Sequence, residues 1–226
     1  MVQQQHKTIN QEDLSLARQR SQSYWFVAGL FLHRPDEEFL ESLADNFAQA
    51  DQAALANNDA MMRLQSCLQL TDLSQLSTQL GVEYTRLLRG IKQGYGPPPP
   101  YESLYRENRL MGEATLAVIR HYQLAGYSEL EESVGPQDHI GAELRFMALL
   151  CHDEADARLQ ANATEAAKIR TAQITFLERH LLAWVPDYCD RLQQETREPF
   201  YGAVAGLTAE LLAEDHMLLQ TLPAST

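Results

Sequence analysis

His139 and Glu143 are the pair of side chains whose types and spacing come nearest to a metal site. They stand four residues apart in a segment that reads as helix, so both would project from one face and reach a single ion. A metalloprotease helix needs a second histidine, in the order H-E-x-x-H, and no other His or Cys stands at ligand spacing here. A structural pair or a role in partner recognition remain the alternatives, and we predict no metal.

Nucleophilic catalysis has little support in the sequence. Ser103 lacks the surroundings of a nucleophile elbow, and Cys67, Cys151 and Cys189 fall in predicted helices without an identifiable neighbouring base. Neither a Walker loop nor a G-x-G-x-x-G motif occurs. We therefore predict no catalytic residue, no cofactor of the protein's own, and a protein that is not an enzyme.

Asp138 and His139 form a second candidate group, for which two interpretations stay open. Asp138 is well placed to be the N-cap of the helix that follows it. Alternatively, its carboxylate and the neighbouring imidazole line one edge of a groove, where they meet arginine or backbone donors of a bound peptide.

Four consecutive prolines interrupt the helical pattern between Gly94 and Arg106. Because each proline fixes φ and removes a backbone donor, we expect the segment from Gly96 to Pro99 to run extended. With its tyrosines it would supply a rigid apolar wall for the same groove, although aromatics beside prolines often serve packing alone. These tyrosines are Tyr95, Tyr101 and Tyr105.

Composition narrows the class of protein. The 226 residues carry 31 acidic against 18 basic side chains, a formal charge of −13, which argues against nucleic-acid binding and favours a cationic partner. Three widely spaced cysteines without a C-x-x-C pair fit a reducing cytoplasm. No secretory signal and no apolar run of 18 residues is present, so we expect a cytoplasmic protein with no membrane span.

Apolar residues recur at helical spacing along most of the chain, and no segment alternates with the period of a strand. We predict an all-α fold, a single globular bundle of about nine to eleven helices over residues 1–226, with residues 1–9 flexible. The expected helices cover about 10–33, 36–48, part of 59–70, 73–89, a stretch from 110 to about 126, a segment after Asp138, a long helix within 155–184, and a last helix from 199.

Three ordered segments resemble the successive motifs of the TorD/DmsD/NarJ family of redox-enzyme maturation chaperones. They are Glu83–Leu88 (EYTRLL), Pro97–Tyr105 (PPPPYESLY) and Asp138–Met147 (DHIGAELRFM). A later segment, His180–Pro186 (HLLAWVP), is similar to a further family motif, so the resemblance extends from about Tyr24 to Leu218.

The resemblance implies a TorD-like cytoplasmic chaperone. Such a protein binds the twin-arginine signal peptide and the apo form of a molybdoenzyme, assists cofactor insertion and holds back export through the Tat translocase. The molybdenum cofactor belongs to the client. The implied client-binding residues are Tyr84, Pro99, Pro100, Tyr101, Ser103, Tyr105, Asp138, His139 and Glu143, whereas Trp184 and Pro186 are implied to be structural.

Several members of that family place tryptophan where Tyr101 stands and a small residue where Glu102 stands, which leaves the client unidentified. The family resemblance allows either a monomer or a domain-swapped homodimer. Two other functions stay open: a guanine-nucleotide-binding protein or hydrolase, with weak GTP binding, and a structural assembly subunit of a reductase complex. The sequence lacks the phosphate cradle that the nucleotide alternative requires.

Overall fold

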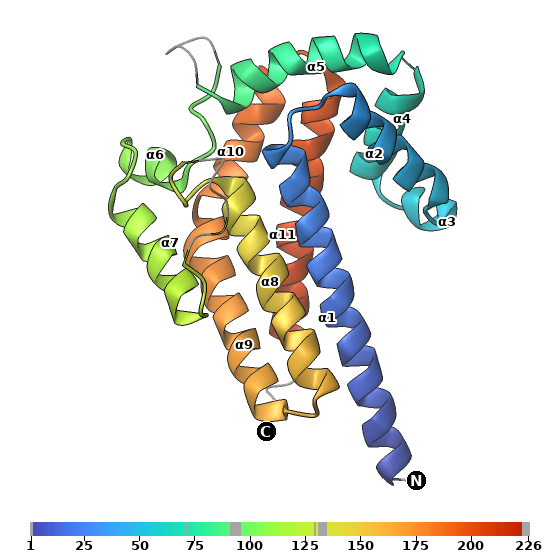
Figure 1. Ribbon diagram of the computed structural model, residues 1–226, viewed down its shortest axis with the longest axis vertical. Helices are drawn as coiled ribbons and strands as arrows, with labels where there is room; N and C mark the ends of the chain where they lie inside the picture. Colours follow the sequence, from blue (N-terminus) through green and yellow to red (C-terminus); the bar gives the residue numbers. More distant parts are fainter. Residues whose placement is uncertain (1, 71, 91–95, 129, 131–134, 223–226) are drawn as a thin grey trace.

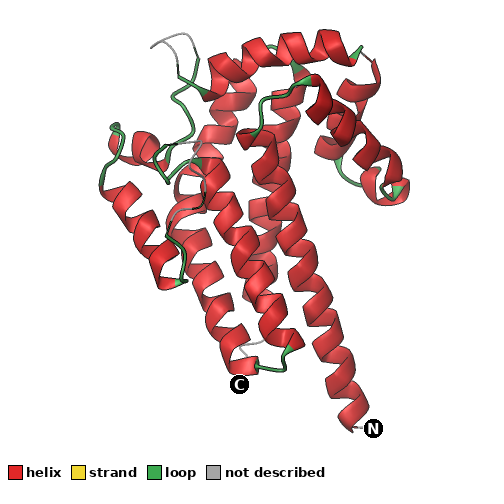
Figure 2. Ribbon diagram, viewed as in Figure 1, coloured by secondary structure: helices red, strands yellow, loops and turns green. Residues whose placement is uncertain are grey.

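The computed structural model describes residues 2–70, 72–90, 96–128, 130 and 135–222, and within them it contains helices and no strand (Figure 2). The predicted all-α fold is confirmed. The helices are α1 (Val2–Leu32), α2 (Glu37–Gln49), α3 (Gln52–Leu55), α4 (Asp59–Leu70), α5 (Leu73–Leu88), α6 (Glu102–Glu107), α7 (Glu113–Leu124), α8 (Ile140–Leu159), α9 (Ala163–Phe176), α10 (Leu182–Glu195) and α11 (Pro199–Thr221).

Helices α1, α8 and α11 and the continuous run from α9 to α10 lie side by side along the molecule, and shorter helices lie at one end and along its flanks (Figure 1). Helix α8 packs between α1 and α9, while α10 and α1 both pack against α11. Helix α5 lies across the end of this bundle, α2 and α4 pack together beside it, and α6 and α7 cover the opposite flank. No helix of the described residues is long and apolar enough to cross a membrane.

Helix α8 is the centre of the bundle, because most of its side chains are buried on all sides. Its start lies unusually close to the end of α1. A Cβ atom added to Gly141 would stand 2.5 Å from Cγ of Leu32, so only glycine permits this approach. The end of α1 therefore lies next to the start of α8, with which the proline segment also pairs, as described below.

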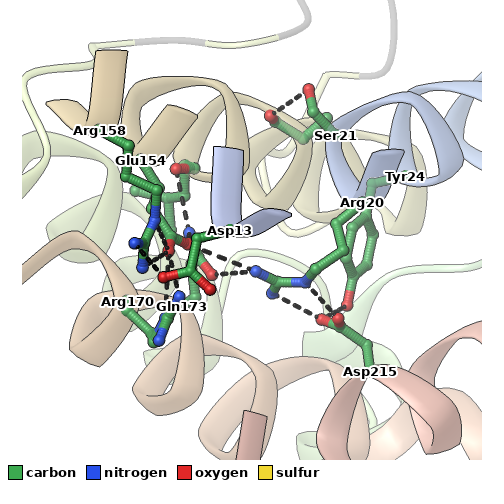
Figure 3. Close-up of polar contacts among 11 residues, drawn as sticks. Asp13, Arg20, Ser21, Tyr24, Glu154, Arg158, Arg170, Gln173 and Asp215 are labelled. Carbon is green, nitrogen blue, oxygen red and sulfur yellow. Dashed lines mark hydrogen bonds and ion pairs between the residues drawn. The ribbon is translucent and has the colours of Figure 1, made fainter. Parts of the chain in front are cut away.

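A buried network of charges joins α1, α8, α9 and α11 below the aromatic core (Figure 3). Asp215 receives hydrogen bonds from Nη2 of Arg20 at 2.9 Å and from the hydroxyl of Tyr24 at 2.7 Å. Glu154 receives them from Arg170 at 2.7 Å and from Arg158 at 2.8 Å. Helical spacing within 155–184 places Arg170 in a stripe of otherwise apolar residues. The network explains this charge, because the guanidinium of Arg170 is paired inside the bundle.

Two predicted boundaries are wrong for identifiable reasons. The long helix within 155–184 is divided, because α8 ends at Leu159 and Ala161 adopts a left-handed turn (φ 56°) before α9 begins. The expected stop before Pro186 is also absent, and α10 continues to Glu195. A π-turn at Leu177–Leu181 precedes this proline, so the missing N–H falls where regular helical pairing is already interrupted.

Elsewhere the predicted elements are close to the observed ones. Helices α4, α5 and α11 begin at the expected residues, and Pro199 is the first residue of α11. Helix α1 begins eight residues before the predicted start at 10, with helical backbone from Val2, whereas flexibility of 1–9 stays a prediction. Helix α6, inside the segment predicted to be a loop, was not anticipated.

Candidate functional site

The proline segment, residues 96–100, precedes α6 and lies against the end of α5, where two glycines allow a close approach. Gly94 and Tyr95 lie outside the described residues, and Gly96–Pro100 is non-helical, as predicted. A Cβ atom at Gly96 would stand 2.4 Å from the backbone oxygen of Arg86, and one at Gly90 (φ 57°) would stand 2.7 Å from Cγ of Pro99. Both glycines are therefore required for the segment to lie on the helix.

The end of this segment pairs with the residues just before α8. The backbone N–H of Ile140 donates to the oxygen of Pro100, and that of Glu102 donates to the oxygen of Asp138, each at 2.9 Å. Tyr101 and His139 thus form an isolated antiparallel bridge, with their rings edge to face at 5.1 Å. The structure brings together the two motifs that sequence analysis had placed in one groove.

The side chains of Asp138 and His139 both cap helices at this junction. Oδ2 of Asp138 accepts a hydrogen bond from the backbone N–H of Ser103 at 2.8 Å and so caps α6. Nδ1 of His139 accepts one from Gly141 at 3.1 Å and is the N-cap of α8. The prediction that Asp138 caps α8 is therefore wrong by one residue. Because both side chains are at least 96% buried, they support the junction and do not line an open groove edge.

Burial determines the ionisation of this junction. It lowers the pKa of His139 to about 3, with help from the positive charge of Arg89, so the imidazole is neutral and able to accept. Burial and the adjacent carboxylate of Glu102 raise the pKa of Glu143 well above its ordinary value. Glu143 accepts a hydrogen bond from Nε1 of Trp184 at 3.2 Å. His139 and Glu143 thus have separate protein partners, and no group of three metal-ligating side chains occurs among the described residues.

Glu102, noted above only as a difference from other family members, is fully buried and contacts two basic side chains. Its carboxylate binds Nδ1 of His180 at 2.8 Å and the guanidinium of Arg106. Nε2 of His180 in turn contacts Nδ1 of His121 at 3.1 Å. This chain of polar contacts runs from α7 through the π-turn to α6, and no local sequence signal identifies it.

The tyrosines of the predicted site take different places. Tyr105 lies beneath the prolines: its hydroxyl donates to the oxygen of Pro98 at 3.0 Å, and its ring stands 5.3 Å from that of Trp184. Burial raises the pKa of Tyr105, so its hydroxyl stays protonated. Tyr84 packs into the core near the end of α1, where its hydroxyl reaches the oxygen of Leu32 at 3.4 Å. Tyr84 thus lies beside the junction, near Tyr101, and is not among the residues that line the hollow described next.

An open hollow of about 610 Å³ separates the proline segment from one face of α10. We call it the proline hollow. The proline segment supplies its apolar wall, and α10 supplies charged and polar side chains at helical spacing. Its lining residues are Gly96, Pro97, Pro98, Asp187, Asp190, Arg191, Gln194 and Glu195.

None of the predicted client-binding residues is among the residues that line this hollow: its prolines are Pro97 and Pro98, which precede the predicted Pro99 and Pro100. The predicted residues Ser103, Asp138, His139 and Glu143 are buried. Sequence analysis did not identify the α10 residues. Their signal was the spacing of Asp187, Asp190 and Arg191, which place three charges on one helix face. Such a face is typical of plain solvent exposure, so the spacing alone indicated no site.

Comparison with known proteins gives concordant matches. The family model described as nitrate reductase delta subunit matches residues 35–190. A chaperone protein TorD from Vibrio cholerae serotype O1 (strain ATCC 39541 / Classical Ogawa 395 / O395) is 23% identical over 222 residues, covering 96% of this chain and 99% of the relative. A chaperone protein TorD from Psychrobacter sp. (strain PRwf-1) is 27% identical over 161 residues, covering 69% and 68%.

Among solved structures, a redox enzyme maturation protein from Archaeoglobus fulgidus superposes with a TM-score of 0.51 at 21% sequence identity. The superposition covers 85% of this chain and 93% of that one. At this identity the likeness shows a shared helical fold.

Proposed function

The chain belongs to the nitrate reductase delta subunit family of redox-enzyme maturation chaperones, and from this premise we propose that it binds the twin-arginine signal peptide of an apo-molybdoenzyme in the proline hollow. A chaperone role is non-enzymatic, so the redox chemistry and the molybdenum cofactor belong to the client. By covering the signal peptide in the cytoplasm, the protein delays export while the cofactor is inserted.

The main support for this proposal is the set of residues that line the proline hollow. Asp187 and Asp190 face it, and neither forms a hydrogen bond or ion pair with the rest of the chain that the structure describes. Pro97 and Pro98 form the opposite wall. A twin-arginine signal presents two guanidinium groups beside an apolar segment, which matches free carboxylates facing a rigid apolar surface.

The overall charge supports the same partner. A formal charge of −13 attracts a cationic peptide from a distance and speeds its encounter with the protein. The buried junction of Asp138, His139 and Tyr101 holds the proline wall in place, so the hollow is formed before any peptide arrives. A preformed wall lowers the ordering cost of binding.

Calorimetric titration of a synthetic twin-arginine signal peptide tests the proposal. We expect saturable binding that weakens when both arginines are replaced by alanine and when the salt concentration rises. Absence of saturable binding by native molybdoenzyme signal peptides, tested one by one from the source organism, contradicts it.

A further inference from the structure

Among the described residues that line the proline hollow, Arg191 is the one cation, and its position is unusual. It stands four residues after Asp187 and four before Glu195 on α10, the spacing at which helical ion pairs form. The structure shows neither pair. Instead, Cζ of Arg191 lies 5.7 Å from the centre of the Tyr105 ring.

The surroundings of Tyr105 explain why Arg191 lies over its ring. Its hydroxyl is fixed on Pro98 and its ring packs against Trp184 and Tyr188, so the ring is held rigidly at the base of the proline segment. A guanidinium stacks favourably on such an electron-rich face. Helix α10 packs against α6, which carries Tyr105. Arg191 therefore reaches the ring from its own helix.

Two consequences follow for the proline hollow. First, Asp187 and Asp190 have no cationic partner within the described part of the chain, since Arg191 contacts the Tyr105 ring and Arg86 lies 3.8 Å from Glu195. Second, the aromatic face best suited to a guanidinium is already covered by one. The hollow thus attracts an external arginine with its carboxylates while its own arginine holds the aromatic position.

We propose that Arg191 is a built-in competitor for the client's arginine, displaced from the Tyr105 ring when the peptide binds. This inference rests on the proposed function and adds the ligand group and its regulation to it. On displacement, Arg191 turns to Glu195 on its own helix, where it forms the ion pair that it lacks in the free protein, while Asp187 and Asp190 receive the client's arginine. The competition selects guanidinium over ammonium, because a planar guanidinium is the better replacement on the ring.

Three variants separate the parts of this competition. Arg191→Ala exposes the Tyr105 ring and removes a positive charge, and we expect it to bind the twin-arginine peptide roughly 3- to 10-fold more tightly. Arg191→Met removes the charge but keeps a chain of similar length over the ring, so its gain should be smaller. Arg120→Ala on α7 makes the same change in net charge outside the hollow and should bind as the wild type does.

Weaker binding by Arg191→Ala than by the wild type overturns the inference, because Arg191 then contacts the peptide directly. Equal affinity of the wild type and Arg191→Ala overturns it while leaving the proposed function intact. Equal gains in Arg191→Ala and Arg191→Met reduce the effect to charge alone and contradict competition for the ring. Circular dichroism and thermal melting of each variant show that the fold is retained.

A second probe does not depend on the client. Ethylguanidinium should shift the NMR signals of the Tyr105 ring, assigned with Tyr105→Phe, at lower concentration in Arg191→Ala than in the wild type. Ethylammonium should shift them less in both. Equal ethylguanidinium responses of the wild type and Arg191→Ala contradict the competition, whether or not the peptide binds. If Arg191→Ala responds at lower concentration, as expected, but neither protein binds the peptide, the proposed function is contradicted.

Discussion

The carboxylate of Asp138 caps a helix that begins 36 residues before it in the chain: its Oδ2 accepts the backbone N–H of Ser103 at 2.8 Å, in the first turn of α6. Tyr101, the N-cap residue of α6, makes no side-chain capping bond of its own. The short helix therefore depends on a group from the start of α8. This relationship makes Asp138 a structural support of the proline segment.

Replacing Asp138 by alanine should destabilise the protein. The substitution leaves the buried N–H of Ser103 without an acceptor, which costs about 1 to 3 kcal/mol in the free energy of unfolding. Urea denaturation followed by circular dichroism measures the change. Asp138→Asn keeps an acceptor oxygen and is expected to lose less. If Asp138→Ala unfolded like the wild type yet lost peptide binding, the residue would be a direct ligand of the client.

Removing the negative charges of Asp187 and Asp190 on α10 should weaken binding of the peptide without lowering the stability of the fold. Asp187 and Asp190 are exposed and form no hydrogen bond or ion pair within the described part of the chain. Asp187→Asn with Asp190→Asn is therefore expected to leave the free energy of unfolding nearly unchanged. The same pair should raise Kd for a twin-arginine peptide about tenfold. Glu41→Gln with Asp45→Asn, two exposed carboxylates of α2, makes the same change in net charge. Similar losses in both double variants would show that only long-range attraction is involved.

Helical periodicity predicted most of the bundle because it is a local property of the chain. The stripe containing Tyr24, Val27 and Phe31 is buried in α1, and the helix through Gly81 runs to Leu88 as expected. The same spacing predicts a buried stripe in the last helix that includes Leu211 and Leu218. At the far end of α11, Leu212 and Leu219 are buried instead. The side chains next to the expected ones therefore face the core.

What the sequence could not reveal depends on contacts between distant segments. Helix α6 needs the carboxylate of Asp138, and the passage of α10 through Pro186 needs the preceding π-turn. The proline hollow exists only because Pro97 and Pro98 stand opposite α10. Without knowledge of that packing, the spacing of Asp187 and Asp190 indicates only a solvent-exposed helix face. Composition and motifs thus led to the partner that we propose, whereas the surface that we propose for it depends on tertiary packing.

The buried network around Arg20 should dominate the stability of the helical bundle. Arg20→Ala leaves Asp215 without its guanidinium partner in a site where both side chains are at least 94% buried. Removal of one partner from a buried ion pair costs about 3 to 5 kcal/mol. Lys168→Ala, which breaks the exposed pair with Glu165, should change unfolding by less than about 0.5 kcal/mol. Equal small effects in urea denaturation would show that the Arg20 network is not a main source of stability.

His139 should make the protein less stable as the pH falls. Its pKa is about 3 in the folded state and about 6.5 when unfolded, so between these values the unfolded chain binds the extra proton. Stability from the neutral imidazole is therefore complete above about pH 6.5 and declines below it, by at most about 1.4 kcal/mol per pH unit. His139→Asn retains a capping acceptor without titrating. Its unfolding free energy should fall less steeply than that of the wild type between pH 6.5 and 4, and parallel profiles would contradict the prediction.

Glu143 should make the protein less stable as the pH rises, the opposite of the effect of His139. The reason is that burial and the neighbouring Glu102 raise the pKa of Glu143 in the folded state. The folded protein then holds a proton that the unfolded chain releases above about pH 4.5. Stability contributed by the neutral acid is complete below that pH and is lost as the pH rises toward the folded-state pKa.

Glu143→Gln keeps an oxygen that accepts from Nε1 of Trp184 and cannot ionise. The variant should match the wild type near pH 4.5 and exceed it increasingly toward pH 7, by up to about 1.4 kcal/mol per pH unit. Glu41→Gln, on the exposed face of α2, should show no such divergence. If Glu143→Gln and the wild type kept a constant difference in unfolding free energy from pH 4.5 to 7, Glu143 would be ionised in the folded protein. The junction behind the proline wall would then hold a buried negative charge, and Trp184 would stabilise a carboxylate instead of a carboxylic acid.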